Sequence, residues 1–170
     1  METEPQWYEL RDSVYSKLFD HAEELLQANP QLLMLTNRLG ETVLHYLAVE
    51  NDIEGVAWLH DHGFSLNTRT DSGTPMVFEV ASLGHIGLLL WLSQNGTDFS
   101  VLDEENCGIF EHLLDGLEQE LLDPSTEEYA IKYWRRHEEA IRFLKENISG
   151  ISMSEEQQTL FSALNARAAR

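Results

Sequence analysis

The His60-Asp61-His62 triplet is the part of this sequence that comes nearest to a metal site. Imidazole and carboxylate groups are common zinc ligands. If the segment is helical, however, successive side chains turn by about 100°, so the two histidines point about 200° apart. They cannot hold one ion from one face of the helix. We therefore expect no metal site at this triplet.

Cys107 and His112 are the only thiol and imidazole that lie close together in the sequence. A nucleophilic cysteine needs a base within reach and a third group that orients the base. No glycine-rich anion loop, Gly-x-Ser-x-Gly turn or suitably spaced carboxylate accompanies this pair. We expect no catalytic residue and no cofactor, so a metal-dependent or cysteine enzyme is the weakest alternative.

The Trp134-Arg135-Arg136-His137 segment is a short basic turn that could contact nucleic acid. It is followed at once by Glu138 and Glu139. A single basic turn of this kind is more often a solvated helix face, or an intramolecular partner for acidic residues elsewhere. We favour that structural interpretation.

Charge is the most informative bulk property of the chain. Thirty acidic and 11 basic side chains among 170 residues give a formal net charge of −19. Polyanions are repelled by such a surface, so we expect no direct nucleic-acid partner. Residues 103–128 hold ten of the acids and no base. This run could form a binding surface for a basic partner, or could pair with bases near the carboxyl end, which are Arg135, Arg136, Arg142 and Lys145.

The chain has none of the usual signs of a membrane or secreted protein. Its longest strongly apolar run, residues 86–92, contains Gly87 and is far shorter than the roughly 20 residues that cross a bilayer. Its acidic start carries no signal-peptide pattern. The single cysteine cannot form an internal disulfide, in keeping with a reducing compartment. We expect one cytoplasmic domain that does not bind membranes and is monomeric when free.

The middle of the chain repeats itself with a period of 33 residues. Turn glycines, apolar residues and one tryptophan all recur in step. The pairs are Gly40 with Gly73, Ala48 with Ala81, Ile53 with Ile86, Trp58 with Trp91, Leu59 with Leu92, and Gly63 with Gly96, and Asn67 falls opposite Ser100.

The residue pattern within each period resembles the ankyrin repeat. Residues 37–45 are similar to its turn and first helix, and residues 63–67 to its closing segment; the second copy runs from Gly73-Thr74-Pro75-Met76 to Asn95-Gly96-Thr97-Asp98. Val43 stands in place of the motif proline, and Phe78 in place of the second histidine. The resemblance implies an all-α fold: an ankyrin-repeat solenoid of stacked helix pairs with short hairpin loops and, here, extra carboxyl-terminal helices.

Several residues have a physical role in such a repeat. Gly40 and Gly73 suit turn positions with positive φ, and Thr42 or Pro75 opens the first helix. Left-handed caps are expected where helices end, at Asn51, Gly84, Gly63 and Gly96. Apolar residues, with Trp58 and Trp91 largely buried among them, form the stripe between repeats. The resemblance implies that His45 forms a structural hydrogen bond.

We divide the chain, as one domain of residues 1–170, into an amino-terminal cap repeat (7–36), two repeats (37–69 and 70–102), a divergent repeat (103–148) and a carboxyl-terminal helix (149–170). In the cap we expect helices over 7–18 and 20–27, with Tyr15, Leu18, Leu25 and Leu26 in the core. Later helices are expected over 109–122, from a capping box at Ser125 to Asn147, and from a second capping box at Ser154 to Ala168.

Ankyrin repeats grip other proteins with their hairpin tips and the exposed side of their inner helices, which the resemblance transfers to this chain by position. The predicted partner-binding residues are Arg38, Leu39, Glu41, Val49, Glu50, Asp71, Ser72, Thr74, Ser82, Leu83, Glu104, Glu105, Cys107, Glu111 and Asp115, flanked by Tyr46 and Glu79.

The predicted function is a non-catalytic protein–protein interaction module that binds, and masks or inhibits, a basic partner protein. Bacterial ankyrin proteins that resemble this chain in size include inhibitors and immunity proteins that protect a cell from a toxin. The alternative is a structural adaptor or scaffold whose acidity only keeps it soluble.

Overall fold

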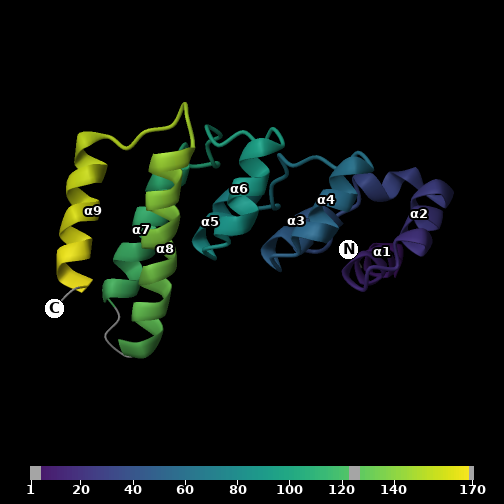
Figure 1. The fold of residues 1–170 in the computed structure, drawn as a ribbon, viewed down its shortest axis with the longest axis horizontal. Coiled ribbons are helices and arrows are strands. Elements are labelled where there is room, and N and C mark those ends of the chain that lie inside the picture. Colours follow the sequence, from purple (N-terminus) through teal and green to yellow (C-terminus); the bar gives the residue numbers. More distant parts are fainter. Residues whose placement is uncertain (1–4, 123–126, 169–170) are drawn as a thin grey trace. The chain divides into compact units, whose positions relative to one another are not determined.

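The computed structural model describes residues 5–122 and 127–168, and within these ranges the regular structure is helical, without strands (Figure 1). This confirms the all-α prediction. The chain divides into two compact units, residues 1–76 and 77–170, which are described separately below.

The first unit consists of helix pairs joined by tight turns. In it α1 packs against α2 and α3, and α3 packs against α4. Its elements are α1 (Pro5–Tyr15), α2 (Phe19–Ala28), the short 3-10 helix η1 (Pro30–Leu33), α3 (Val43–Val49) and α4 (Ile53–Asp61). The two predicted cap helices are thus present, whereas η1 was not predicted.

The predicted core phase of the cap helices is wrong. The buried stripe of α1 is Trp7, Leu10 and Val14, spaced as one helix face requires, so that Tyr15 turns away and is 57% exposed. Leu18 is 58% exposed because α1 has already ended and Lys17 takes a left-handed conformation (φ 62°). In α2 the buried residue is Ala22, while Leu25 and Leu26 are only half-buried.

The predicted helix ends of the repeats are confirmed. The Thr42 hydroxyl caps α3 by accepting from the amide of His45 (3.2 Å), and the Asp52 carboxylate caps α4 by accepting from Gly55 (3.1 Å). Positive φ values stand where left-handed caps were expected, at Asn51, Gly63, Gly84 and Gly96.

The second unit contains the later helices. The long helix α7 packs against both α8 and α9, and α6 packs against α8 (Figure 1). The elements are α5 (Met76–Ser82, of which Met76 closes the first unit), α6 (Ile86–Gln94), α7 (Ile109–Leu122), α8 (Glu127–Asn147) and α9 (Glu155–Ala168). The length of α7 is as predicted.

The two expected capping boxes have different outcomes. At α9 the Ser154 hydroxyl accepts from the Gln157 amide (3.1 Å), and the Gln157 side chain accepts from the Ser154 amide (2.9 Å), which confirms the prediction. The box expected at Ser125 lies outside the described residues.

The tryptophans of the repeats are less buried than predicted. Leu59 and Leu92 are fully buried, but Trp58 and Trp91 beside them are half-buried. The ring of Trp58 stacks with that of Phe19 (centroids 5.3 Å apart) and with that of His62 (3.8 Å).

Candidate protein-binding surfaces

Three hairpins spaced by 33 residues share one hydrogen-bond pattern. In the first, the amide of Asn37 donates to the carbonyl of Glu41 (2.9 Å), and the amide of Gly40 donates back to the carbonyl of Asn37 (3.1 Å). The Asn37 side-chain oxygen also accepts from the amides of Leu39 (2.8 Å) and Glu41 (3.1 Å). One side chain therefore ties the whole turn together.

Thr70 and Asp103 repeat the part of Asn37 in the next two hairpins. The Thr70 amide donates to the carbonyl of Thr74 (3.0 Å), and the Asp103 amide donates to that of Cys107 (3.0 Å). Their side-chain oxygens accept from the amides of Thr74 (3.2 Å) and Cys107 (2.9 Å), respectively. The fourth residue of each turn has positive φ: Gly40, Gly73 and Asn106. The third repeat thus begins in register.

The first two hairpins contact each other within the first unit. The amide of Asp71 donates to the carbonyl of Leu39 over 2.9 Å. Gly40 lies so close that an added Cβ would come within 2.2 Å of the Asp71 nitrogen. The tips therefore hold Arg38, Leu39, Asp71 and Ser72 outward; all four are exposed.

The other predicted site residues of the first unit differ in exposure. Glu50 is exposed, whereas Tyr46, Val49 and Thr74 are half-buried. Glu41 is only 8% exposed, and its carboxylate accepts a hydrogen bond from the side chain of Asn37. Glu41 therefore serves the hairpin and offers a partner little surface.

In the second unit the predicted acidic residues are the accessible ones. Glu104 and Glu105 at the hairpin, and Glu111 and Asp115 on α7, are exposed. The remaining predicted residues, which are Glu79, Ser82, Leu83 and Cys107, are half-buried. On α8, Arg142 pairs with Glu138 of its own helix (2.6 Å) rather than with this acidic run.

The prediction omitted one cluster in the first unit. Arg11 on α1 lies over the rings of Trp7, Tyr8 and Tyr46. A spacing of four between Trp7 and Arg11 is a sequence signal for such a contact on a helix. Tyr46 comes from α3, and only the packing of α1 against α3 brings it in.

The electrostatics around Cys107 disfavour nucleophilic chemistry. Partial desolvation raises the pKa of its thiol, and the carboxylates of Glu111, Asp103, Asp115 and Glu105 raise it further. A reactive thiol requires the opposite shift. Burial lowers the pKa of His112 and keeps that imidazole neutral, and the nearby Asp103 only partly opposes this effect.

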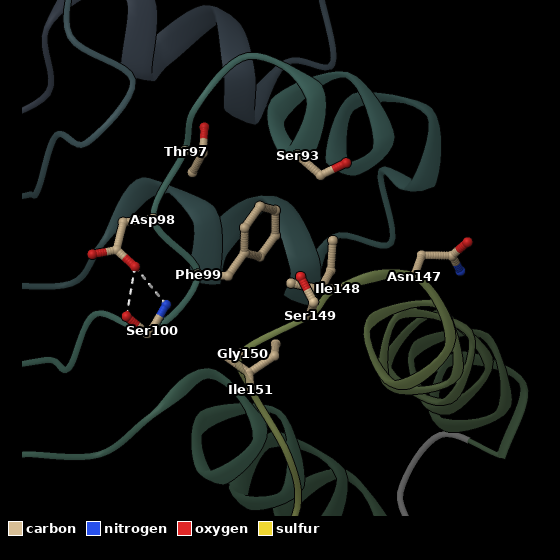
Figure 2. Close-up of a pocket in the computed structure, with 10 residues that line it drawn as sticks. All are labelled: Ser93, Thr97, Asp98, Phe99, Ser100, Asn147, Ile148, Ser149, Gly150 and Ile151. Atoms are coloured by element: carbon tan, nitrogen blue, oxygen red, sulfur yellow. Dashed lines mark hydrogen bonds between the residues drawn. The ribbon is translucent and has the colours of Figure 1, made fainter.

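A pocket of about 370 Å³ lies beside the loops after α6 and α8 (Figure 2). Its lining includes Ser93, Asn147 and Ser149, with Asp98 as the only ionisable member. The Asp98 carboxylate accepts from the amide (2.8 Å) and hydroxyl (2.7 Å) of Ser100, bonds that lower its pKa (Figure 2). The lowered pKa keeps this carboxylate ionised near neutral pH and makes it a weaker base, which disfavours a role for Asp98 as a general acid.

The other chemically notable histidines have structural contacts. Nδ1 of His62 lies 2.6 Å from the Trp58 carbonyl, and Nδ1 of His60 lies 3.3 Å from that of Phe64. His45 is fully buried, with Nδ1 3.3 Å from the Thr68 hydroxyl.

None of the helices in the described ranges combines the length and apolar character that a bilayer crossing requires.

Comparison with known proteins agrees with the hairpin pattern. A family model described as ankyrin repeats (many copies) matches residues 25–81. No curated protein matches the chain. Ankyrin repeats are non-catalytic modules that mediate protein–protein interaction, so the match supports a binding module. The matched segment contains the first two hairpins, with their 33-residue spacing, and is helical as the family requires. This chain therefore contains ankyrin repeats, which the family match places in residues 25–81.

Proposed function

We propose that this chain binds a protein with a basic surface and masks that surface, as an inhibitor or an immunity protein does. The observation that carries the proposal is the exposed acidic set in the second unit, formed by Glu104, Glu105, Glu111 and Asp115. These residues occupy a repeat hairpin and an adjacent helix, the parts of an ankyrin repeat that face a partner.

The lack of salt bridges to this acidic set, within the described residues, supports a role in binding. Within the described part of the chain, no salt bridge joins these four carboxylates to a basic side chain. Four carboxylates so close in sequence repel one another, and a cationic partner would relieve this repulsion. Complementary charge of this kind accelerates encounter and excludes acidic competitors more than it adds affinity.

The whole-chain charge acts in the same direction. A formal charge of −19 on 170 residues produces an attractive field for a basic protein over roughly one Debye length, about 8 Å at physiological salt. Masking fits this charge better than scaffolding, because a scaffold must hold two partners and most of this field has one sign.

The test is capture of binding partners from a native extract, with two immobilised proteins. One is the wild type; the other carries Glu104→Gln, Glu105→Gln, Glu111→Gln and Asp115→Asn, here called the neutral-set variant. The proposal expects a basic protein that the wild type retains at low salt and the neutral-set variant retains at least several-fold less.

A control variant with four other exposed acids changed, Glu23, Glu24, Glu155 and Glu156 to Gln, has the same net charge as the neutral-set variant. It should capture as the wild type does. Equal capture by all three proteins would contradict the proposal and would favour an adaptor whose acidity confers only solubility.

A further inference from the structure

The guanidinium of Arg11 lies over three aromatic rings of the first unit. Its central carbon is 5.0 Å from the ring centre of Tyr8, 5.2 Å from that of Tyr46 and 5.7 Å from that of Trp7. All three distances fall within the roughly 6 Å range in which the face of an aromatic ring attracts a cation.

The rings are arranged as a floor and two walls. Tyr8 and Tyr46 each stand at 83° to Trp7, with centroid distances of 5.2 Å and 5.7 Å. We call these three residues the aromatic cage. Trp7 is 1% exposed, whereas Tyr8 is 37% exposed and Tyr46 is half-buried, so the walls reach solvent while the floor is covered.

A second observation concerns the floor. The indole N–H of Trp7 is buried and has no hydrogen-bond partner among the described residues. An unpaired buried donor costs about 1–3 kcal/mol, which a phenylalanine at this place would avoid. Tryptophan, however, is the ring that attracts cations most strongly. The cage therefore has the side chain best suited to holding a cation, in spite of this cost.

Arg11 can leave the cage without losing its counter-ion. The exposed carboxylate of Asp12 accepts from Nε (2.8 Å) and Nη2 (2.6 Å) of Arg11. Asp12 faces solvent and can keep this pair outside the rings. Residues 1–76 contain thirteen acids and four bases, so an incoming cation is attracted to this unit.

We infer that the aromatic cage is a binding site for an arginine guanidinium of the partner protein, and that Arg11 fills it while the partner is absent. The inference rests on the proposed function, since it assumes a basic partner. Tyr46 links the aromatic cage to the proposed function, because this residue flanks the surface predicted to face the partner. Arg11 thereby acts as an internal competitor that lowers the apparent affinity of the aromatic cage for an incoming cation.

The test uses a small probe, ethylguanidinium, so that it needs no partner protein. It is titrated into the full chain labelled with ¹⁵N, and the indole N–H signal of Trp7 is followed, identified by its absence in Trp7→Phe. Arg11→Met should bind the probe about tenfold more tightly than the wild type, because the cage is then unfilled. Arg11→Gln serves as a second opening variant if Arg11→Met is unstable.

Two matched variants complete the design. Arg38→Met removes an exposed arginine of the same unit that is not over any of the three rings, and it should bind the probe as weakly as the wild type does. Arg11→Met combined with Tyr46→Leu removes one wall and should lose the gain. Equal binding by the wild type and both opening variants, or undiminished binding without Tyr46, would overturn the inference. Tighter binding of tetramethylammonium than of ethylguanidinium would contradict the guanidinium assignment.

The outcomes separate this inference from the proposed function. If the neutral-set variant loses a captured basic protein but the probe does not bind the opened cage, only the cage assignment fails. If the probe binds but no basic partner is captured, the cage is a cation site and the proposed function fails.

Discussion

The backbone amide of Asp71 donates a 2.9 Å hydrogen bond to the carbonyl of Leu39, which joins two neighbouring hairpin tips. Gly40 lies directly against this bond, and a Cβ there would come within 2.2 Å of the Asp71 nitrogen. A backbone atom cannot rotate aside as a side chain can. Position 40 therefore requires glycine for this close approach as well as for its φ of 81°.

Gly40→Ala should lower the free energy of unfolding by about 3 kcal/mol, since it adds a backbone clash to the left-handed strain. The matched control is Gly63→Ala, which has a φ of 95° but no atom within 4 Å of the added Cβ. It should cost only the conformational part, about 1–2 kcal/mol. Urea unfolding measures both; equal losses would show that the hairpin contact contributes nothing.

Asp52 performs two tasks that substitution can separate. It caps α4 through the Gly55 amide and forms an ion pair with Lys17. Asp52→Asn keeps a capping oxygen and should cost at most about 1 kcal/mol, the usual value of such a pair. Asp52→Ala removes both and should cost about 2 kcal/mol. If Asp52→Asn proves as damaging as Asp52→Ala in urea unfolding, the ion pair outweighs the cap.

Burial of His112 should make the protein sensitive to mild acid. Because burial lowers the pKa of His112 in the folded state, the unfolded chain takes up this proton first. The contribution of the neutral His112 to the free energy of unfolding is fully present above the pKa of histidine in the unfolded chain, about 6.5. It is lost as the pH falls from there through the pKa of the folded state. His112→Gln should therefore lose less stability than the wild type between pH 7 and pH 5, as thermal unfolding at each pH will show. Parallel curves would refute this assignment.

The thiol of Cys107 should react slowly with a disulfide reagent near neutral pH. Its raised pKa reduces the thiolate fraction, and nearby carboxylates contribute to that shift. The pH dependence of the rate should give an apparent pKa above that of an unfolded cysteine. The double substitution Glu111→Gln with Asp115→Asn should lower this apparent pKa. Cys107→Ser should leave folding and binding unchanged. A rate faster than that of the unfolded chain would reverse our view of this residue.

Local turn chemistry is what could be predicted best from the amino-acid sequence. Gly40, Gly73, Asn51 and Gly84 have the positive φ values that their types and spacing predict, because such conformations depend on a few neighbouring residues. The limits of α7 were equally accessible, since apolar periodicity and Pro124 mark its extent.

Features that depend on packing could not be predicted in the same way. Tyr15 is adjacent to the buried Val14, and one step of about 100° around α1 separates core from surface. Glu41 occupies a tip position but is buried, and its carboxylate accepts a hydrogen bond from the Asn37 side chain. The aromatic cage requires the approach of α1 to α3, which no repeat pattern encodes.

The most direct test of the account is the association rate with the captured basic partner, measured by stopped flow from 50 mM to 500 mM salt. Wild type and the four-site control should associate fast at low salt and slow steeply as salt rises, while dissociation changes less. The neutral-set variant should associate several-fold more slowly at low salt and converge on them at high salt, where screening hides the charges. An association rate at low salt that is the same for the neutral-set variant and the control would contradict recognition through Glu104, Glu105, Glu111 and Asp115.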